Sequence, residues 1–235
     1  MKNPHENHRE RVKQEFLLRG FDENTPPHKI LELLLFYCVP RVDTNPLAHE
    51  LIDRYKTLSG VLDAPVEELI TFKGLTLNNV GLLKMIMPLA RIYQAENRFD
   101  GEGFGAYDEM CRYMVGRFMG LTNEHFAVMY IDPLGKMIDF TFASKGGGNN
   151  VSISNRELLE GVIRTKATAV VIAHNHHNGL PLPSDQDVIA TERIADVLAS
   201  VDVKLIDHLI ISRNVYVSMA QSKSYKYIFN KERIV

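Results

Sequence analysis

The sequence predicts a two-part chain of the α/β (α+β) class, in which an all-helical N-terminal domain precedes a mixed α/β domain. Residues 1–96 space their apolar side chains as helices do and show no alternating strand pattern. Residues 97–106 are polar and contain three glycines, which is typical of a linker. Residues 107–235 mix strand-like runs with helical segments, so we expect a central β-sheet flanked by helices there.

Prolines mark several of the expected helix boundaries in the first part. The pair at 26–27 precedes an apolar run at 30–36, and Pro40 is expected to end that helix. Pro46 and Pro65 suit the first turns of two further helices, because proline lacks only an amide hydrogen that has no partner there. The helix that begins near Pro46 is expected at 45–56, and the remaining helices of this part are expected at 8–18 and 78–96.

The second part begins with a helical pattern from residue 107 and continues with strands and helices in alternation. A turn at 132–135 separates two apolar runs, which predicts a hairpin. Ser154 and Glu157 fit the capping box of a helix that ends near residue 165. We expect a further helix at 185–200 and strands at 126–131, 137–143, 168–173, 203–211 and 215–219.

Composition narrows the function class. The chain has 235 residues, 45% of them hydrophobic, and a net charge of −2, so bulk charge does not favour nucleic acid, although a local basic patch stays open. Cys38 and Cys111 lie in apolar helical patterns without CxxC spacing, which argues against a disulfide scaffold and a cysteine zinc site. A polar start and the lack of a long apolar segment favour a cytoplasmic protein that does not enter membranes.

Three side chains near one strand end have the chemistry of a zinc site. His174 and His176 follow a buried strand, and alternate residues of an extended chain point to the same side. Asp187 in the first turn of the next helix could return a carboxylate to them. Three such ligands with a vacant fourth position are typical of catalytic zinc, so we predict one Zn²⁺ per chain.

Plainer interpretations of the same residues exist. Ser184 and Asp187 are also a good helix start, with serine as N-cap and an acid favoured by the helix dipole. A His-x-His pair alone is more often a hydrogen-bonding loop feature. The cap and the ligand interpretations are compatible, because the same two side chains can serve both.

The spacing His174-x-His176, seven residues, Ser184, two residues, Asp187 resembles the metal motif of the JAMM, or MPN-plus, metalloproteases. The text around it is similar to the RadC branch of that family in particular, over nearly the whole chain. The segments that carry this likeness are 8–11, 31–35, 43–46, 59–64, 173–176, 183–187 and 205–210.

The resemblance implies a zinc-dependent hydrolase with metallopeptidase or isopeptidase chemistry on a protein or peptide substrate that the sequence does not name. It also implies that Glu124, just before an early strand, is the general acid/base for the attacking water. Ser184 would hydrogen-bond the oxyanion of the tetrahedral intermediate. Taken without the family, Glu124 is an ordinary solvated residue at a strand end.

The chain departs from the RadC pattern in two places. Residues 177–179 read His-Asn-Gly where the family usually has Pro-Ser/Gly-Gly, which affects the rigidity of the loop after the histidines. His177 is a solvated loop residue or an additional polar contact. The N-terminal helix-hairpin-helix-like domain is degenerate, because Thr76 replaces the second glycine of a Gly-x-Gly turn whose amides can hold a DNA phosphate.

Two other functions stay open at this point. One is a DNA-repair or recombination accessory protein with little catalysis, although basic and acidic residues balance over 1–98 and give DNA binding no support from charge. The other is a metal-stabilised interaction module without activity. Asp207 and His208, on an expected strand, are either an ordinary hydrogen-bonded pair or a support for the metal ligands.

Overall fold

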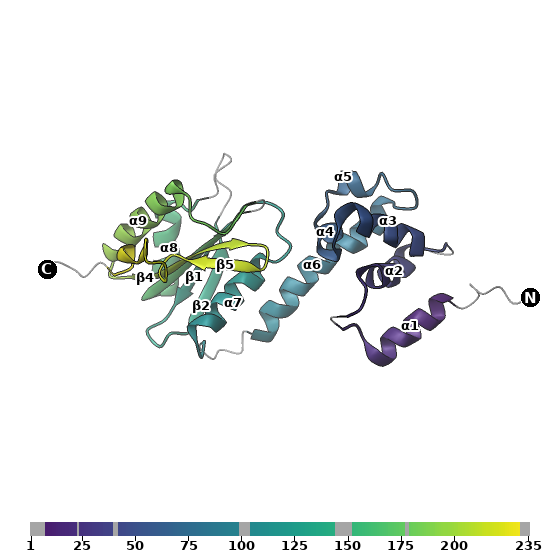
Figure 1. Ribbon diagram of the computed structural model, residues 1–235. Helices are drawn as coiled ribbons and strands as arrows, with labels where there is room; N and C mark the ends of the chain where they lie inside the picture. The colour runs from purple at the N-terminus through teal and green to yellow at the C-terminus, as the bar shows by residue number, and fades with distance from the viewer. Residues whose placement is uncertain are drawn as a thin grey trace, which may run out of the picture. The chain divides into compact units, whose positions relative to one another are not determined.

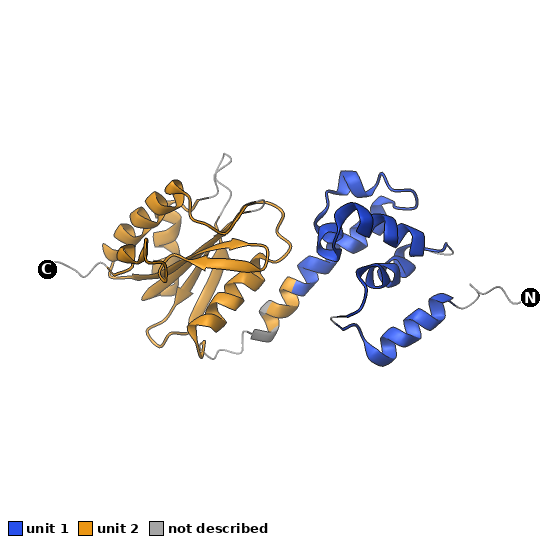
Figure 2. Ribbon diagram, in the orientation of Figure 1, with its two compact units in different colours: residues 1–90 blue, residues 91–235 orange. Residues whose placement is uncertain are grey.

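The structure is a computed structural model that describes residues 8–22, 24–39, 42–98, 104–143, 152–176 and 179–230. The chain divides into two compact units, residues 1–90 and 91–235, and the division falls inside one long helix (Figure 2). The expected domain limits at 96 and 107 stay predictions, and much of the expected linker, residues 99–103, lies outside the described residues. The expected helix-ending Pro40 also lies outside them.

The first unit is helical throughout its described part, as expected. Leucines at helical spacing form its core, and Leu31, Leu51 and Leu83 are fully buried. Proline opens the second and third helices, in agreement with the sequence prediction. The helices are α1 (His8–Arg19), α2 (Pro27–Cys38), α3 (Asn45–Tyr55), α4 (Leu58–Asp63), α5 (Val66–Leu69) and α6 (Leu77–Arg98).

The short helix α4 was not expected from the apolar spacing, because six residues are too few to display a helical period. Its start is nevertheless marked in the sequence by Thr57, whose hydroxyl accepts a hydrogen bond from the Gly60 amide at 2.9 Å. A cap residue is therefore a better signal than periodicity for a helix of this length.

The turn before α6 contains the residue that replaces the family's second glycine. The Thr76 amide donates to the Asn79 side-chain oxygen at 2.6 Å, and the Thr76 hydroxyl donates to the same oxygen. Gly74 of this turn has φ +99°. Thr76 thus begins α6, and its amide is already engaged within the helix start rather than directed at a ligand.

The second unit has the mixed α/β fold that the sequence predicts (Figure 1). Its sheet has the order β2-β1-β3-β4-β5, and only the β3–β4 pair is parallel. The elements are α7 (Tyr107–Phe118), β1 (Phe126–Ile131), β2 (Met137–Phe142), α8 (Asn155–Thr165), β3 (Ala169–Asn175), α9 (Asp185–Ala199), β4 (Lys204–Ser212), β5 (Val215–Ser218) and a 3-10 turn, η1 (Lys226–Ile228).

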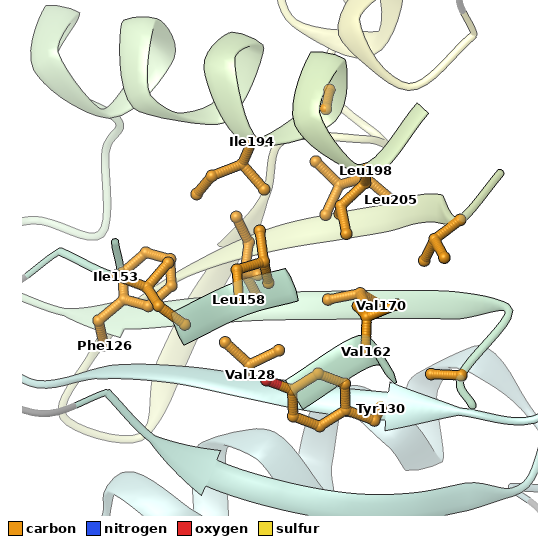
Figure 3. Packing of buried hydrophobic residues seen from close by; sticks show 14 of the residues in the cluster. Phe126, Val128, Tyr130, Ile153, Leu158, Val162, Val170, Ile194, Leu198 and Leu205 are labelled. Carbon is orange, nitrogen blue, oxygen red and sulfur yellow. The ribbon is translucent and has the colours of Figure 1, made fainter. Parts of the chain in front are cut away.

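Alternation along the strands builds a separate core on each face of this sheet. One face packs against α8 and α9, with Val128, Ile172 and Ile210 among the strand residues that contribute (Figure 3). The other face packs against α7 through residues such as Met129 and Leu209. The inner strands of the sheet are therefore buried on both sides, and this explains why β1 and residues 169–173 of β3 are continuously apolar rather than alternating.

Helix α8 approaches β1 so closely that only glycine fits at the contact. A Cβ atom on Gly161 would lie 2.0 Å from the Tyr130 hydroxyl oxygen, and the Tyr130 side chain is itself almost fully buried. We predict that Gly161→Ala lowers the free energy of unfolding by about 1–3 kcal/mol, because the helix or the ring must shift in a packed core. Urea unfolding measures this. Gly81→Ala is the control, because a Cβ at that helical glycine meets no atom within 4 Å.

Among the described residues, no helix has the length and apolar character needed to cross a membrane.

Candidate metal centre

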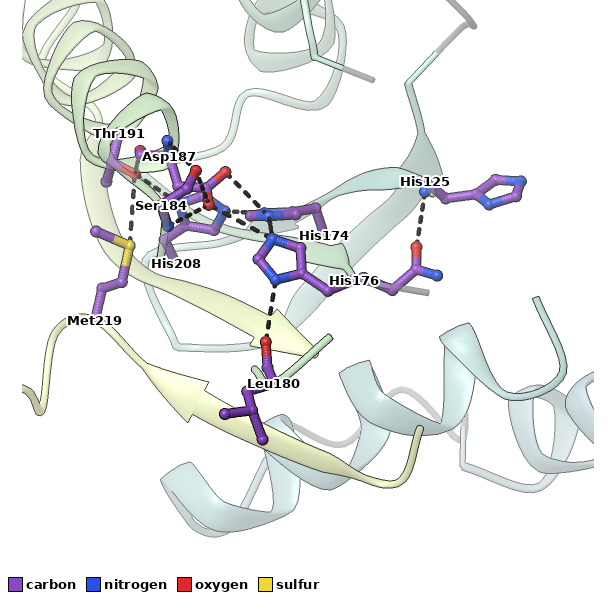
Figure 4. Close-up of polar contacts among 10 residues, drawn as sticks. His125, His174, His176, Leu180, Ser184, Asp187, Thr191, His208 and Met219 are labelled. Carbon is purple, nitrogen blue, oxygen red and sulfur yellow. Dashed lines mark hydrogen bonds and ion pairs between the residues drawn. The ribbon is translucent and has the colours of Figure 1, made fainter. Parts of the chain in front are cut away.

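Three side chains with metal-binding atoms converge where β3 ends and α9 begins. The Nε2 atoms of His174 and His176 lie 2.9 Å apart. Asp187 Oδ1 is 3.1 Å from His174 Nε2, and Asp187 Oδ2 is 3.5 Å from His176 Nε2 (Figure 4). Strand β3 extends two residues further than expected, so that His174 belongs to the strand and His176 follows it directly. The three residues named from the sequence therefore do lie together.

A capping box fixes the carboxylate of this group. Ser184 is the N-cap of α9, and its hydroxyl oxygen accepts from the Asp187 amide at 3.2 Å. In return, Asp187 Oδ2 accepts from the Ser184 amide and from the Ser184 hydroxyl, each at 2.7 Å. The helix-start interpretation and the ligand geometry thus coexist, because the cap holds Oδ2 while Oδ1 faces His174.

Hydrogen bonds on the far side of each imidazole orient the two histidines. His176 Nδ1 lies 3.2 Å from the Leu180 carbonyl oxygen, which can only accept, so Nδ1 carries a hydrogen and Nε2 is the nitrogen that can bind a metal. The Ser212 hydroxyl donates to the Gly179 carbonyl at 2.7 Å and attaches this loop to β4. His174 Nδ1 lies 2.8 Å from Nε2 of His208. Both Nε2 atoms therefore point at the carboxylate.

The electrostatics of the group favour an ionised Asp187 carboxylate and a neutral His208 behind the ligands. Partial burial acts to raise the pKa of Asp187, but the hydrogen bond and charge of His174 and the bonds from Ser184 outweigh it and hold that pKa well below its usual value. Burial, with a further contribution from His174, lowers the pKa of His208 well below that of an exposed histidine. A carboxylate and neutral imidazoles are the protonation states that bind a metal.

The arrangement fits a zinc ion in size and chemistry. With bonds of about 2.0–2.1 Å, the edges of a tetrahedron around zinc measure about 3.3 Å. His174 Nε2 lies at similar distances from His176 Nε2, 2.9 Å, and from Asp187 Oδ1, 3.1 Å. Two imidazole nitrogens with one carboxylate oxygen form a donor set that zinc accepts. The side chains of His176 and Asp187 are 22% and 17% exposed, so solvent can reach the group.

The structure does not bring Glu124 into this group. Its side chain is exposed and makes no hydrogen bond or ion pair with another described residue. It lies close along the chain, however, because it stands two residues before Phe126, which pairs with His174 across the β1–β3 ladder. His177 and Asn178, where the loop departs from the family pattern, lie outside the described residues.

Residues 105–224, more than half of the chain, match the model of the RadC-like JAB domain. The chain belongs to this family. A UPF0758 protein of Fusobacterium nucleatum subsp. nucleatum is 34% identical over 221 residues, which cover 91% of this chain and 95% of that protein. A UPF0758 protein of Ruegeria pomeroyi is 30% identical over 211 residues, covering 90% and 94%. The likeness to both relatives therefore extends well into the helical unit.

In this RadC-like JAB domain, Asn175 holds the segment that carries Glu124. Its side-chain oxygen accepts from the His125 amide at 2.7 Å, and its side-chain nitrogen donates to the Asn123 carbonyl at 3.0 Å. The two peptides that flank Glu124 are thus attached to β3 between the two histidines. This role of Asn175 was not predicted from the sequence, in which Asn175 is only the spacer of the His-x-His motif.

We predict that Asn175→Ala frees this segment without removing zinc ligands. The His125 amide would lose its acceptor, and its hydrogen-exchange rate would rise about 5- to 10-fold, as expected for one hydrogen bond of about 1 kcal/mol. Exchange measured residue by residue in the wild type and the variant checks this. The Ala143 amide, which donates to the Phe126 carbonyl at 2.8 Å, is the internal control and should not change.

Asp207 and His208, considered together in the sequence, have different surroundings in the structure. Successive residues of β4 point to opposite faces, so His208 turns toward α9 and the metal ligands, whereas Asp207 turns toward α7. Asp207 is fully buried and accepts hydrogen bonds from Tyr107, Ser218 and the Ala220 amide. Only His208 is in direct contact with a candidate ligand.

Proposed function

We propose that the chain is a zinc-dependent hydrolase of the JAMM/MPN-plus type that cleaves an amide or isopeptide bond. The observation that carries the proposal is the convergence of His174, His176 and Asp187 at a partly exposed strand end, with no fourth side chain of the described residues closing the group. A structural zinc site would supply four protein ligands, whereas a catalytic one leaves a position open.

Zinc, when bound by these three side chains, supplies Lewis acidity that lowers the pKa of a water molecule and polarises a carbonyl group. The chain's own residues prepare for this. The bond from His176 to the Leu180 carbonyl and the capping bonds from Ser184 to Asp187 hold two of the three ligands in place before any metal arrives. Such preorganisation keeps the cost of ordering the site low.

The proton transfers are assigned to Glu124. Its carboxylate would accept a proton from the attacking water and later deliver it to the leaving nitrogen. The attachment of its flanking peptides to Asn175 supports this role, because it keeps the backbone of the segment beside the histidines. Glu124 is exposed, so its side chain is free to turn toward the reacting group.

We assign Ser184 the role of hydrogen-bonding the oxyanion of the tetrahedral intermediate. Its hydroxyl now donates to Asp187 Oδ2, and the Ser184 amide donates to the same oxygen. When the hydroxyl hydrogen turns to the oxyanion, the amide bond to Oδ2 remains, so Asp187 keeps a partner throughout. The capping box therefore allows one serine to serve both the helix and the reaction.

The experiment is a cleavage screen with zinc-loaded protein on fluorogenic peptides and on peptides joined through a lysine side chain. We expect cleavage of at least one amide class, its loss after zinc is removed with a chelator, and its return when zinc is added back. Cleavage that persists after metal removal, or a zinc-loaded protein that cleaves neither class, contradicts the proposal.

A further inference from the structure

A chain of hydrogen-bonding groups runs behind His174, away from the candidate metal position (Figure 4). His174 Nδ1 lies 2.8 Å from His208 Nε2, and His208 Nδ1 lies 2.6 Å from the Thr191 hydroxyl oxygen. That hydroxyl in turn lies 2.5 Å from the backbone carbonyl oxygen of Asp187. His208 and Thr191 are 1% and 0% exposed, so no water competes for these bonds.

The Asp187 carbonyl oxygen, at the end of this series of hydrogen bonds, sets the direction in which the other groups donate. The Asp187 carbonyl can only accept, so the Thr191 hydroxyl donates to it and is left to accept from Nδ1–H of His208. Neutral His208 then offers a lone pair on Nε2, to which His174 donates from Nδ1–H. The other acceptor near the hydroxyl, Met219 Sδ at 3.7 Å, is weaker and more distant.

The direction of these hydrogen bonds decides which ring nitrogen of His174 is free to bind a metal. In the neutral His174 ring that a metal binds, a hydrogen on Nδ1 leaves the lone pair on Nε2, the atom that faces Asp187 and His176. The reverse direction would place the hydrogen on His174 Nε2, where it blocks a metal, and would leave the Asp187 carbonyl without the threonine bond. Phe126 lies beside both the His174 and the His208 rings and limits their rotation, whichever nitrogen carries the hydrogen.

We propose that His208 and Thr191 are positioning residues that select the metal-binding tautomer of His174. This inference rests on the zinc site of the proposed function. The same helix that brings Asp187 to the metal also supplies the hydroxyl and the carbonyl that end the chain of bonds. The two ligands are therefore coupled through one turn of α9, and neither positioning residue touches the substrate.

The test compares zinc affinity among hydroxyl variants. Thr191→Val keeps the shape of the side chain and removes the hydroxyl, so we expect zinc affinity to fall about 10-fold in competition with a chromophoric chelator. Thr191→Ser retains a hydroxyl and should restore most of the affinity. Thr165→Val is the matched control, because the Thr165 hydroxyl makes the same kind of bond, to the Gly161 carbonyl at 2.8 Å, on α8.

A second variant and a second readout separate positioning from stability. His208→Leu removes the acceptor of His174 and should weaken zinc binding about 10- to 100-fold. Nitrogen-15 NMR of the histidine rings in zinc-loaded wild type should show the hydrogen of His208 on Nδ1. A merely structural role would lower the thermal stability of the Thr191→Val variant and leave its zinc affinity unchanged, as in Thr165→Val.

The outcomes distinguish this inference from the proposed function. Equal zinc affinity in wild type and Thr191→Val, or a hydrogen on Nε2 of His208, overturns the positioning role even if the protein cleaves amides. Zinc binding that depends on Thr191, without any cleavage, supports the positioning role and contradicts the hydrolase. A wild type that binds no zinc overturns both.

Discussion

Replacing Glu124 by glutamine is expected to lower turnover by about 10²- to 10⁴-fold while zinc stays bound. Glutamine has nearly the same size but cannot accept the proton of the attacking water, and general acid/base groups contribute about this much. Zinc should remain because Glu124 is not among the three converging ligands. The measurement is kcat on a substrate found in the cleavage screen, with zinc content determined on the same sample.

The control for this variant is Glu67→Gln, which changes an exposed glutamate in helix α5 of the other unit. It should leave turnover unchanged. Equal turnover in wild type and Glu124→Gln would remove the assignment of Glu124. Loss of zinc in Glu124→Gln would instead mean that Glu124 is a ligand when metal is bound.

Replacing Asp207 by alanine is expected to lower the free energy of unfolding by about 3–5 kcal/mol. The Asp207 carboxylate accepts from the Tyr107 and Ser218 hydroxyls and from the amides of His208 and Ala220, all inside the unit. Without it the two hydroxyls can still bond each other, since they lie 2.9 Å apart, but the amides lose this acceptor. Each unsatisfied buried donor costs about 1–3 kcal/mol, and a cavity adds to that.

Urea unfolding of the wild type and the variant measures this difference. Asp108→Ala is the control, because Asp108 is an exposed residue in the first turn of α7, where a lost carboxylate costs at most about 1 kcal/mol. A loss of less than 1 kcal/mol in Asp207→Ala would show that the network rearranges and does not depend on the carboxylate.

Much of the fold could be predicted because its signals are local. Serine caps at 154 and 184, prolines at helix starts and apolar runs in the strands all depend on neighbours within a few residues. The order of the strands could not be predicted in this way. It depends on which strands pair across long separations, and the bounds of β3 and β4 do not reveal that they are parallel neighbours.

The residues of the candidate site could likewise be predicted only where their signals are local in the sequence. His174, His176 and Asp187 could be named because strand alternation and a helix cap are local features. The roles of Asn175 and His208 could not, since each depends on a segment distant in sequence. Asn175 needs the loop at 123–125 beside it, and His208 needs the register that pairs it with Ile172. Glu124 came from family resemblance alone.

The central claim is one zinc ion per chain held by His174, His176 and Asp187, and elemental analysis of untagged protein tests it most directly. We predict about one zinc per chain in the wild type and close to none in folded His174→Ala and Asp187→Ala variants, because two remaining ligands hold zinc weakly. A wild type that stays free of zinc after reconstitution, or variants that retain a full equivalent, would contradict the account.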